Sequence, residues 1–100
     1  MNSYLVERYL PGTSEAELRT GLRRVHVACA ELSAAGTSVR YLGSMFLPLE
    51  EACFCRFEGA VADAVAQANE LAGVPFARIN AGVAVTPDEV ISHQPDTGRR

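Results

Sequence analysis

The sequence predicts an α+β domain of the ferredoxin-like type, in which two helices cover one face of a four-stranded antiparallel sheet. Three observations predict this fold. Two β-prone runs, residues 37–46 and 52–58, flank a short turn of proline and glutamate, as in an antiparallel hairpin. A segment with helical spacing stands on each side of this hairpin. A strand-like segment precedes the first of these helices and another follows the second, so the order is βαββαβ.

The first strand and the first helix are indicated by alternation and by a capping motif. Residues 3–9 alternate as a strand does, and one face of that strand carries Tyr4, Val6 and Arg8. Ser14 and Glu17 then form a capping box, which predicts a helix that runs to about residue 35. Apolar side chains recur along it every three or four residues: Leu18, Leu22, Val25, Cys29 and Leu32.

The second half of the chain supplies the remaining elements. Residues 60–72 are weakly amphipathic and end at Gly73, which predicts the second helix. Residues 76–85 predict the fourth strand. Thr86 and Glu89 form a second capping box around a proline, so a short helical turn should follow. From residue 92 the chain is polar, and we expect one domain over 1–91 with a polar tail over 92–100.

This fold leaves one face of the sheet without helices. Alternation assigns the helix-facing side to Val6, Val39, Tyr41, Met45, Cys53, Cys55, Phe57, Ile79 and Val83. It assigns the opposite side to Leu5, Glu7, Tyr9, Arg40, Leu42, Ser44, Phe46, Phe54, Arg56 and Asn80. The second set is too apolar for open water and too polar for a dry core, so we expect it to meet a second copy in a closed homodimer, with or without a pocket. A single β-bulge would exchange part of the two sets.

Composition excludes several classes of protein. The net charge is −3 and no basic cluster exceeds the pair Arg23-Arg24, so we expect no nucleic-acid partner. All nine basic residues are arginine, which excludes Schiff-base chemistry and a Walker-type lysine. No apolar run is long enough to span a membrane, and we expect no signal peptide. Three cysteines without a secreted-scaffold spacing predict free thiols and a cytoplasmic protein.

Four segments in order carry a resemblance to a known family: YLVERYLPG, VRYLGSMFLPLEEACFCRFEG, ANELAGVPFARI and VTPDEV. They resemble the small actinobacterial proteins grouped with a streptomycete nickel-binding protein, formerly a domain of unknown function. The resemblance covers residues 3–91 and implies a dimeric ferredoxin-like fold of the α+β barrel type and a bound transition metal, with nickel as the candidate cofactor. The metal-binding branch is richer in histidine. This chain has only His26 and His93, and His26 matches a family histidine on the first helix.

The metal candidates are His26, Cys29 and Cys55. His26 and Cys29 are spaced i, i+3 and share a helix face, so they could offer two ligands to a borderline or soft metal. Cys55 is expected to face the same helix, and Glu7 or Glu58 could add an oxygen donor. The alternatives are a half-buried helix histidine and thiols that fill the core, or a Cys55 thiolate nucleophile beside Arg56. A bridge between Cys53 and Cys55 is not expected, because residues i and i+2 of a strand are about 6.5–7 Å apart.

The ligand-binding candidates are Arg40, Tyr41, Ser44 and Arg56. The two arginines suit a carboxylate, phosphate or enolate oxygen, unless they pair with Glu7 or Glu58.

Tyr41 and Ser44 could donate hydrogen bonds to a ligand carbonyl. Glu7, Glu58 or His26 could act as a general base. Three functions therefore stay open. They are a binding protein for a transition metal or small ligand, a cofactor-independent isomerase or cyclase, and a structural or regulatory dimer without a pocket.

Overall fold

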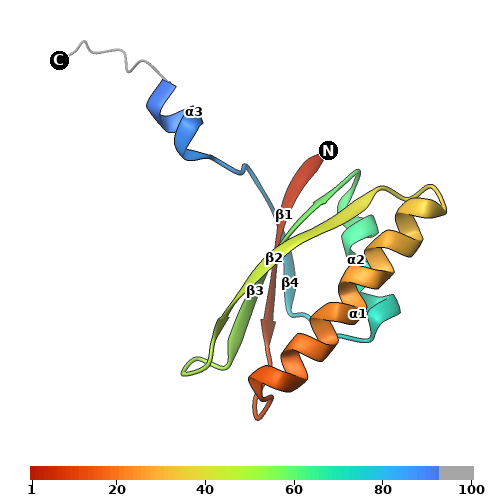
Figure 1. Ribbon diagram of the computed structural model, residues 1–100, viewed down its shortest axis with the longest axis vertical. Coiled ribbons are helices and arrows are strands. Elements are labelled where there is room, and N and C mark those ends of the chain that lie inside the picture. The colour runs from red at the N-terminus through yellow and green to blue at the C-terminus, as the bar shows by residue number, and fades with distance from the viewer. Residues whose placement is uncertain (93–100) are drawn as a thin grey trace.

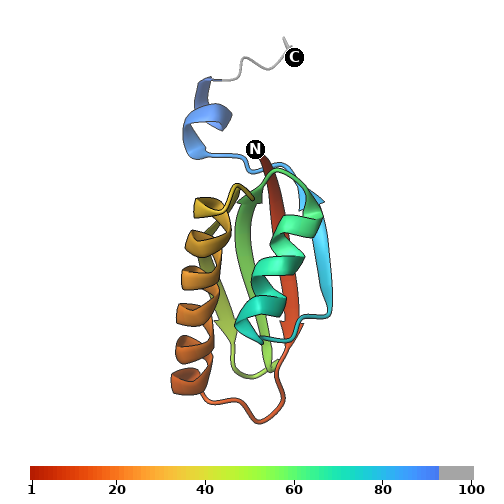
Figure 2. The same cartoon turned by 90° about the vertical axis from the view of Figure 1, so that its right-hand side faces the viewer.

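The computed structural model describes residues 1–92, and it confirms the predicted βαββαβ order. The elements are β1 (Asn2–Tyr9), α1 (Glu15–Ala34), β2 (Val39–Leu47), β3 (Ala52–Gly59), α2 (Ala62–Ala72), β4 (Arg78–Gly82) and α3 (Pro87–Ser92). The strands form one antiparallel sheet in the order β2-β3-β1-β4. Helices α1 and α2 lie side by side against one face of that sheet, and no helix of residues 1–92 covers the other face (Figures 1 and 2).

The core lies between the sheet and the two helices. Its fully buried apolar members come from β1, β3, α1 and α2, and they are Val6, Val25, Cys53, Cys55, Phe57, Val65 and Ala68. Burying an apolar side chain of this size stabilises the fold by roughly 1.5–3 kcal/mol. Helix α1 approaches the segment after α2 closely at Gly21, where an added Cβ would lie 3.3 Å from the Val74 side chain. The site described below is therefore held in a packed interior.

Helix α1 begins at the predicted capping box. The backbone N–H of Glu17 donates to Ser14 Oγ over 3.1 Å, and the backbone N–H of Ser14 donates to a Glu17 carboxylate oxygen over 2.8 Å. These hydrogen bonds from Ser14 hold the pKa of Glu17 below its ordinary value. The cap fixes where α1 starts and therefore which of its residues face the sheet.

The register of β2 differs from the predicted one because the strand contains a β-bulge. Tyr41 pairs with Phe57 but Gly43 pairs with Arg56, so Leu42 is an additional residue. Gly43 has a φ of 140°, which favours glycine. Beyond the bulge every side chain changes face.

The assignment of Met45 to the helix side was therefore wrong, and its side chain is 66% exposed. Ser44 and Phe46 were wrongly assigned to the outer face, since they lie opposite Cys55 and Cys53 on the helix side.

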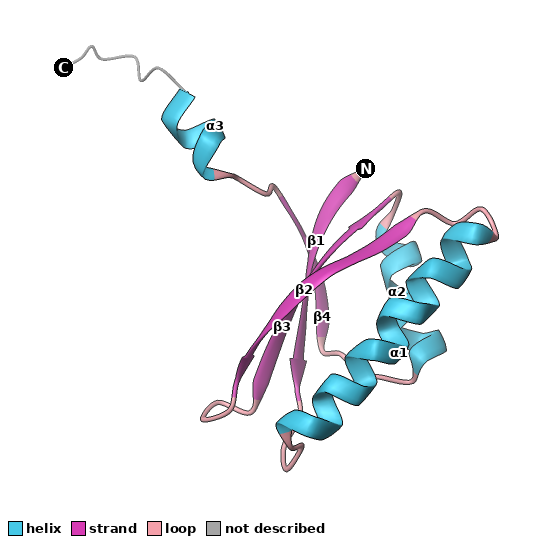
Figure 3. Cartoon of the chain, in the orientation of Figure 1, coloured by secondary structure: helices cyan, strands magenta, loops and turns pink. Residues whose placement is uncertain are grey.

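The fourth strand is shorter than predicted. It ends at Gly82, so the assignment of Val83 to the helix-facing side was wrong, and that residue is 89% exposed. The chain then leads into α3, which buries none of its residues and extends away from the rest of the domain (Figure 3). Thr86 and Glu89 form the expected hydrogen bonds at its start. His93 and the rest of the predicted polar tail lie outside the described residues.

Within residues 1–92, no helix combines the length and the apolar character needed to cross a membrane.

Candidate functional site

A buried arginine lies at the centre of the interior. Arg8 follows Tyr4 and Val6 on the helix-facing side of β1, and its side chain is 0% exposed. One terminal nitrogen donates to Asn69 Oδ1 over 2.8 Å and to Cys55 Sγ over 3.4 Å, and the other donates to the Pro75 carbonyl over 3.3 Å. The Nε atom has no hydrogen-bond partner. No carboxylate of residues 1–92 forms an ion pair with Arg8.

Asn69 orients this guanidinium from the helix side. It is fully buried on α2, and its Nδ2 donates to the Val65 carbonyl over 2.8 Å. That bond requires the amide nitrogen to point toward its own helix, so the Oδ1 atom points toward Arg8. The amide oxygen is neutral, and it satisfies a donor of Arg8 without supplying a countercharge.

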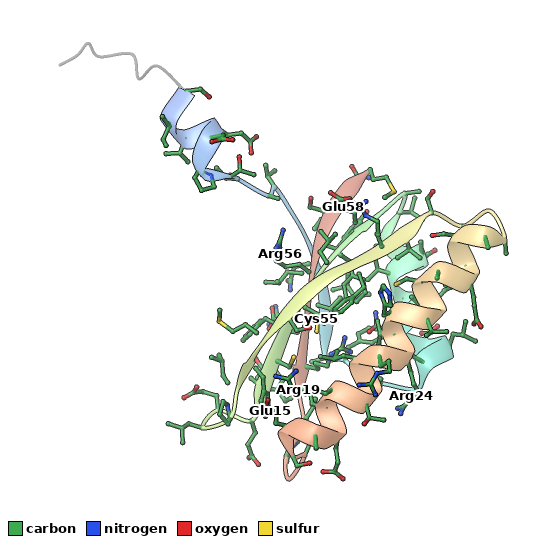
Figure 4. All side chains as sticks on the ribbon, in the orientation of Figure 1. Glu15, Arg19, Arg24, Cys55, Arg56 and Glu58 are labelled. Carbon is green, nitrogen blue, oxygen red and sulfur yellow. The ribbon has the colours of Figure 1, made fainter. Side chains whose placement is uncertain are left out.

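Cys55 supplies the only sulfur that accepts a bond from Arg8 in the part of the chain that the structure describes. It lies on β3 between Val6 of β1 and Ser44 of β2. Its Sγ accepts from Arg8 over 3.4 Å and from Ser44 Oγ over 2.9 Å, and it lies 3.7 Å from Cys53 Sγ. Figure 4 shows Cys55 in the interior of the domain, while the neighbouring Arg56 points away from the helices.

The two cysteines of β3 differ in how readily they ionise. The hydrogen bond from the Cys53 thiol, the Arg8 charge, and the bonds from Ser44 and Arg8 together outweigh burial and lower the pKa of Cys55. The same sulfur–sulfur bond, together with burial, raises the pKa of Cys53. Cys55 is therefore the thiol that ionises first. Cys53 stays protonated, and its S–H group donates a hydrogen bond to Cys55 Sγ.

Tyr41 and Ser44 connect this cluster to the surface. Their hydroxyl oxygens are 2.6 Å apart, and Ser44 is an exposed residue that also contacts Cys55 Sγ. Burial raises the pKa of Tyr41, and the hydrogen bond with Ser44 opposes that rise. Both residues line a groove of about 510 Å³ between α1 and β2. One residue, Ser44, thus links the groove to the sulfur of Cys55.

The structure does not bring the predicted metal ligands together. His26 is exposed on α1, and its ring centroid lies 6.4 Å from that of Tyr41 at an interplanar angle of 64°. Cys29 is buried in the core, and burial raises its pKa to about 11. Among the described residues, no three histidine, cysteine, aspartate or glutamate side chains are grouped so that they could hold a metal ion.

The remaining candidates lie on the outer face of the sheet. Arg40 donates to Glu58 over 2.7 Å, which is the ion pair weighed as the alternative to ligand binding. Glu7 accepts from Asn80 over 2.7 Å and from Arg78 over 3.4 Å.

Arg56 and Glu58 line a hollow of about 300 Å³ together with Leu5 and Leu42. The four predicted ligand-binding residues therefore fall on two sides of the sheet, with Tyr41 and Ser44 on the helix-facing side and Arg40 and Arg56 on the outer side.

Comparison with known proteins identifies the family. Residues 4–81 match the family described as nickel-responsive proteins, SCO4226-like. The chain belongs to this family. Its fold is similar to that of SCO4226 from Streptomyces coelicolor A3(2), known from a crystal structure, with a TM-score of 0.64 and 19% sequence identity over 84% of this chain and 99% of that one. No curated protein matches the chain.

Three residues of the interior cluster, Arg8, Asn69 and Cys53, were not among the predicted site residues. Alternation placed Arg8 on the same face as Val6, and a charged residue on a core-facing position is the signal that could have identified it. Asn69 carries a weaker signal, because an amide on the inner face of a helix is expected to need a buried partner. Neither signal indicates that the partner of Arg8 is a sulfur, since that depends on the register of β3 against β1.

Proposed function

We propose that the protein is a small homodimeric binding protein that holds a transition metal ion, or a small ligand in its place. Membership of the nickel-responsive family is the observation that carries this proposal. The free thiols suit a reducing compartment, and we place the protein in the cytoplasm.

The proposed dimer uses the outer face of the sheet. That face combines exposed apolar side chains with ion pairs: Leu5 is 38% exposed, Tyr9 55% and Met45 66%, beside the Arg40–Glu58 pair. Such a mixed surface suits contact with a second copy of the chain. Apolar contacts would supply the association energy, and the paired charges would set the orientation of the two copies.

The proposed metal site uses His26 as its anchoring ligand. This imidazole is exposed on α1, whereas Cys29 is buried with a protonated thiol, and Cys55 lies against the cation of Arg8, which disfavours a second positive charge there. Residues 1–92 of a single protomer group no three suitable donors. The other ligands would therefore come from a second protomer or from solvent, as nickel accepts nitrogen and oxygen donors.

Calorimetric titration of untagged protein with Ni²⁺, combined with elemental analysis of the purified protein, tests this function. We expect measurable heat with the wild-type protein, and loss of most of it in His26→Ala. Ser92→Ala is the matched control at another exposed site and should bind as the wild type does. The absence of both heat and bound metal would overturn the metal proposal, and undiminished binding by His26→Ala would overturn the role of His26.

A second candidate function rests on the hollow lined by Arg56 and Glu58. A carboxylate and a guanidinium over an apolar floor suit proton transfer with stabilisation of a developing oxyanion, as in a cofactor-independent isomerase or cyclase. Glu7 is the other carboxylate of this face, and His26 is the base on the opposite side. An unchanged metabolite profile after deletion of the gene would contradict this function. So would full activity of a Glu58→Gln, His26→Ala double variant.

A further inference from the structure

We propose that Cys55 is a nucleophilic thiolate paired with the buried guanidinium of Arg8, and that it is a site of oxidation by hydrogen peroxide or a similarly small peroxide. This site is independent of the proposed metal site and of the outer face of the sheet. It rests on the cluster of Arg8, Cys55, Ser44 and Cys53.

The buried positive charge of Arg8 favours a negative charge on Cys55. Arginine keeps its positive charge in proteins, and a buried charge without a countercharge is strongly unfavourable. Arg8 is 0% exposed, and its other acceptors, Asn69 Oδ1 and the Pro75 carbonyl, are neutral. The group among the described residues that touches the guanidinium and can carry a negative charge is Cys55. Its thiolate is therefore the natural counterion.

The donors around the sulfur also favour a thiolate at Cys55. Arg8 donates to Cys55 Sγ, Ser44 Oγ lies 2.9 Å from it, and the Cys53 thiol lies 3.7 Å away. Three donors directed at one sulfur suit a thiolate, because a neutral thiol is a weak acceptor. The groups that face Cys55 come from all the neighbouring strands: Arg8 on β1, Cys53 on β3, and Tyr41 with Ser44 on β2.

The unpartnered Nε atom of Arg8 is an independent observation at the same place. It is buried and lacks an acceptor, although the guanidinium that carries it faces the sulfur. Buried polar atoms without partners are rare in folded proteins and often mark a site with a chemical role. An oxygen added to the sulfur of Cys55 would bring a new acceptor close to this guanidinium.

The groove between α1 and β2 gives the route for the oxidant. Ser44 lines it and contacts Cys55 Sγ, so we expect displacement of this one exposed side chain to open a path to the buried sulfur. The adjacent Gly43 has a φ of 140° in the bulge, and the loosened pairing there eases such a displacement. A peroxide is small and uncharged, which suits passage through such an opening.

The reaction balances with the peroxide as the oxidant. The lone pair of the thiolate attacks one peroxide oxygen, the O–O bond breaks, and the Cys55 sulfur is oxidised by two electrons to a sulfenic acid. The second oxygen leaves as hydroxide and takes a proton from solvent to form water. A low-molecular-weight thiol restores Cys55 in two steps. The first thiol condenses with the sulfenic acid to a mixed disulfide and releases water. A second thiol then attacks that disulfide, which frees the Cys55 thiol and leaves the two small thiols joined as a disulfide.

Labelling of the sulfenic acid tests this proposal in the full chain. The Cys53→Ser background keeps a hydrogen-bond donor beside Cys55 and excludes a bridge between the two positions. The protein is treated with hydrogen peroxide at pH 7 in the presence of dimedone, and the labelled cysteine is identified by mass spectrometry. We expect label on Cys55 and little on Cys29, whose pKa is raised to about 11. Absence of label on Cys55, or faster labelling of Cys29, would overturn the proposal.

Two arginine variants determine which cation activates the thiol. Arg8→Met should slow labelling of Cys55 at least about tenfold, because a return of the thiol pKa toward its ordinary value of 9.0 would leave only about a hundredth of the thiol ionised at pH 7. Arg56→Met is the matched control, since Arg56 adjoins Cys55 in sequence but points to the outer face, and it should react as the background does. Equal rates in both variants would contradict the role of Arg8.

Ser44→Ala keeps the proposal falsifiable if Arg8→Met does not fold. This change affects an exposed residue and removes one donor to the sulfur while it leaves the charge of Arg8 in place. Because the thiolate loses a donor, we expect the rate of labelling of Cys55 to fall several-fold, measured under the same conditions. An unchanged rate would show that the sulfur is not governed by the groups of this cluster.

Discussion

Replacement of Cys55 by serine should remove a defined pH dependence of stability. Serine keeps a small polar group that Arg8 and Ser44 can still contact, but it does not ionise in this range. The pKa of the Cys55 thiol falls from its ordinary value of 9.0 to about 6 in the folded protein. Between these values the unfolded chain binds a proton that the folded protein does not bind.

The sign and the size of the effect follow from that difference. Because unfolding takes up a proton, the free energy of unfolding rises with pH between about 6 and 9, by at most about 1.4 kcal/mol per pH unit for one group. This contribution to the free energy of unfolding is complete above the pKa of Cys55 in the unfolded chain. It is lost as the pH falls through the pKa of Cys55 in the folded protein. Cys53 contributes little well below pH 9.0, since its pKa is raised in the folded protein and its thiol in the unfolded chain ionises only near that ordinary value.

Urea unfolding at a series of pH values measures this slope. The useful quantity is the difference in free energy of unfolding between wild type and Cys55→Ser, because other titrating groups cancel in that difference. We expect the difference to grow in favour of the wild type as the pH rises. Cys29→Ala is the control and should keep the wild-type slope, since the pKa of Cys29 is raised to about 11. A difference that does not change with pH would refute the thiolate assignment.

Three further changes have expected outcomes. Ser14→Ala removes the cap of α1 and should lower the free energy of unfolding by about 1 kcal/mol in urea unfolding, and no measurable change would contradict the role of the cap. Gly43→Ala places a Cβ at a φ of 140° and should destabilise the fold by about 1–3 kcal/mol and slow labelling of Cys55; wild-type behaviour in both would show that the bulge does not position Ser44. Leu5→Glu should convert the proposed dimer to a monomer in size-exclusion chromatography with light scattering, whereas Leu49→Glu, at a 94% exposed turn residue, should not; dimers in both would place the interface elsewhere.

The sequence predicted the fold closely because each element carries a local signal. Residue alternation, the capping box at Ser14 and the glycine after α2 depend only on neighbouring residues, and the structure confirms all three. The faces of β2 could not be predicted to the same degree. The bulge at Leu42 is set by how β2 pairs with β3, and one additional residue exchanges the faces of Ser44, Met45 and Phe46.

The candidate site was predicted in part for a related reason. The sequence indicated a Cys55 thiolate beside an arginine, but it suggested Arg56, the neighbour in the chain, whereas the structure places Arg8 against the sulfur. Arg8 lies 47 residues away in the sequence and reaches Cys55 only through the register of β1 and β3. Contacts between distant segments of this kind are not encoded in local spacing. The ion pair of Arg40 with Glu58, by contrast, was anticipated as the alternative to ligand binding by Arg40.

Titration of the Cys55 side chain by NMR tests the central claim of a thiolate–guanidinium pair most directly. Protein labelled with ¹³C at the cysteine Cβ gives a resonance whose chemical shift reports the ionisation of each thiol, and Cys55→Ser assigns the signal. We expect Cys55 to titrate with a midpoint well below its ordinary value of 9.0, and Arg8→Met to move this midpoint upward. A midpoint at or above 9.0 in the wild-type protein would contradict it.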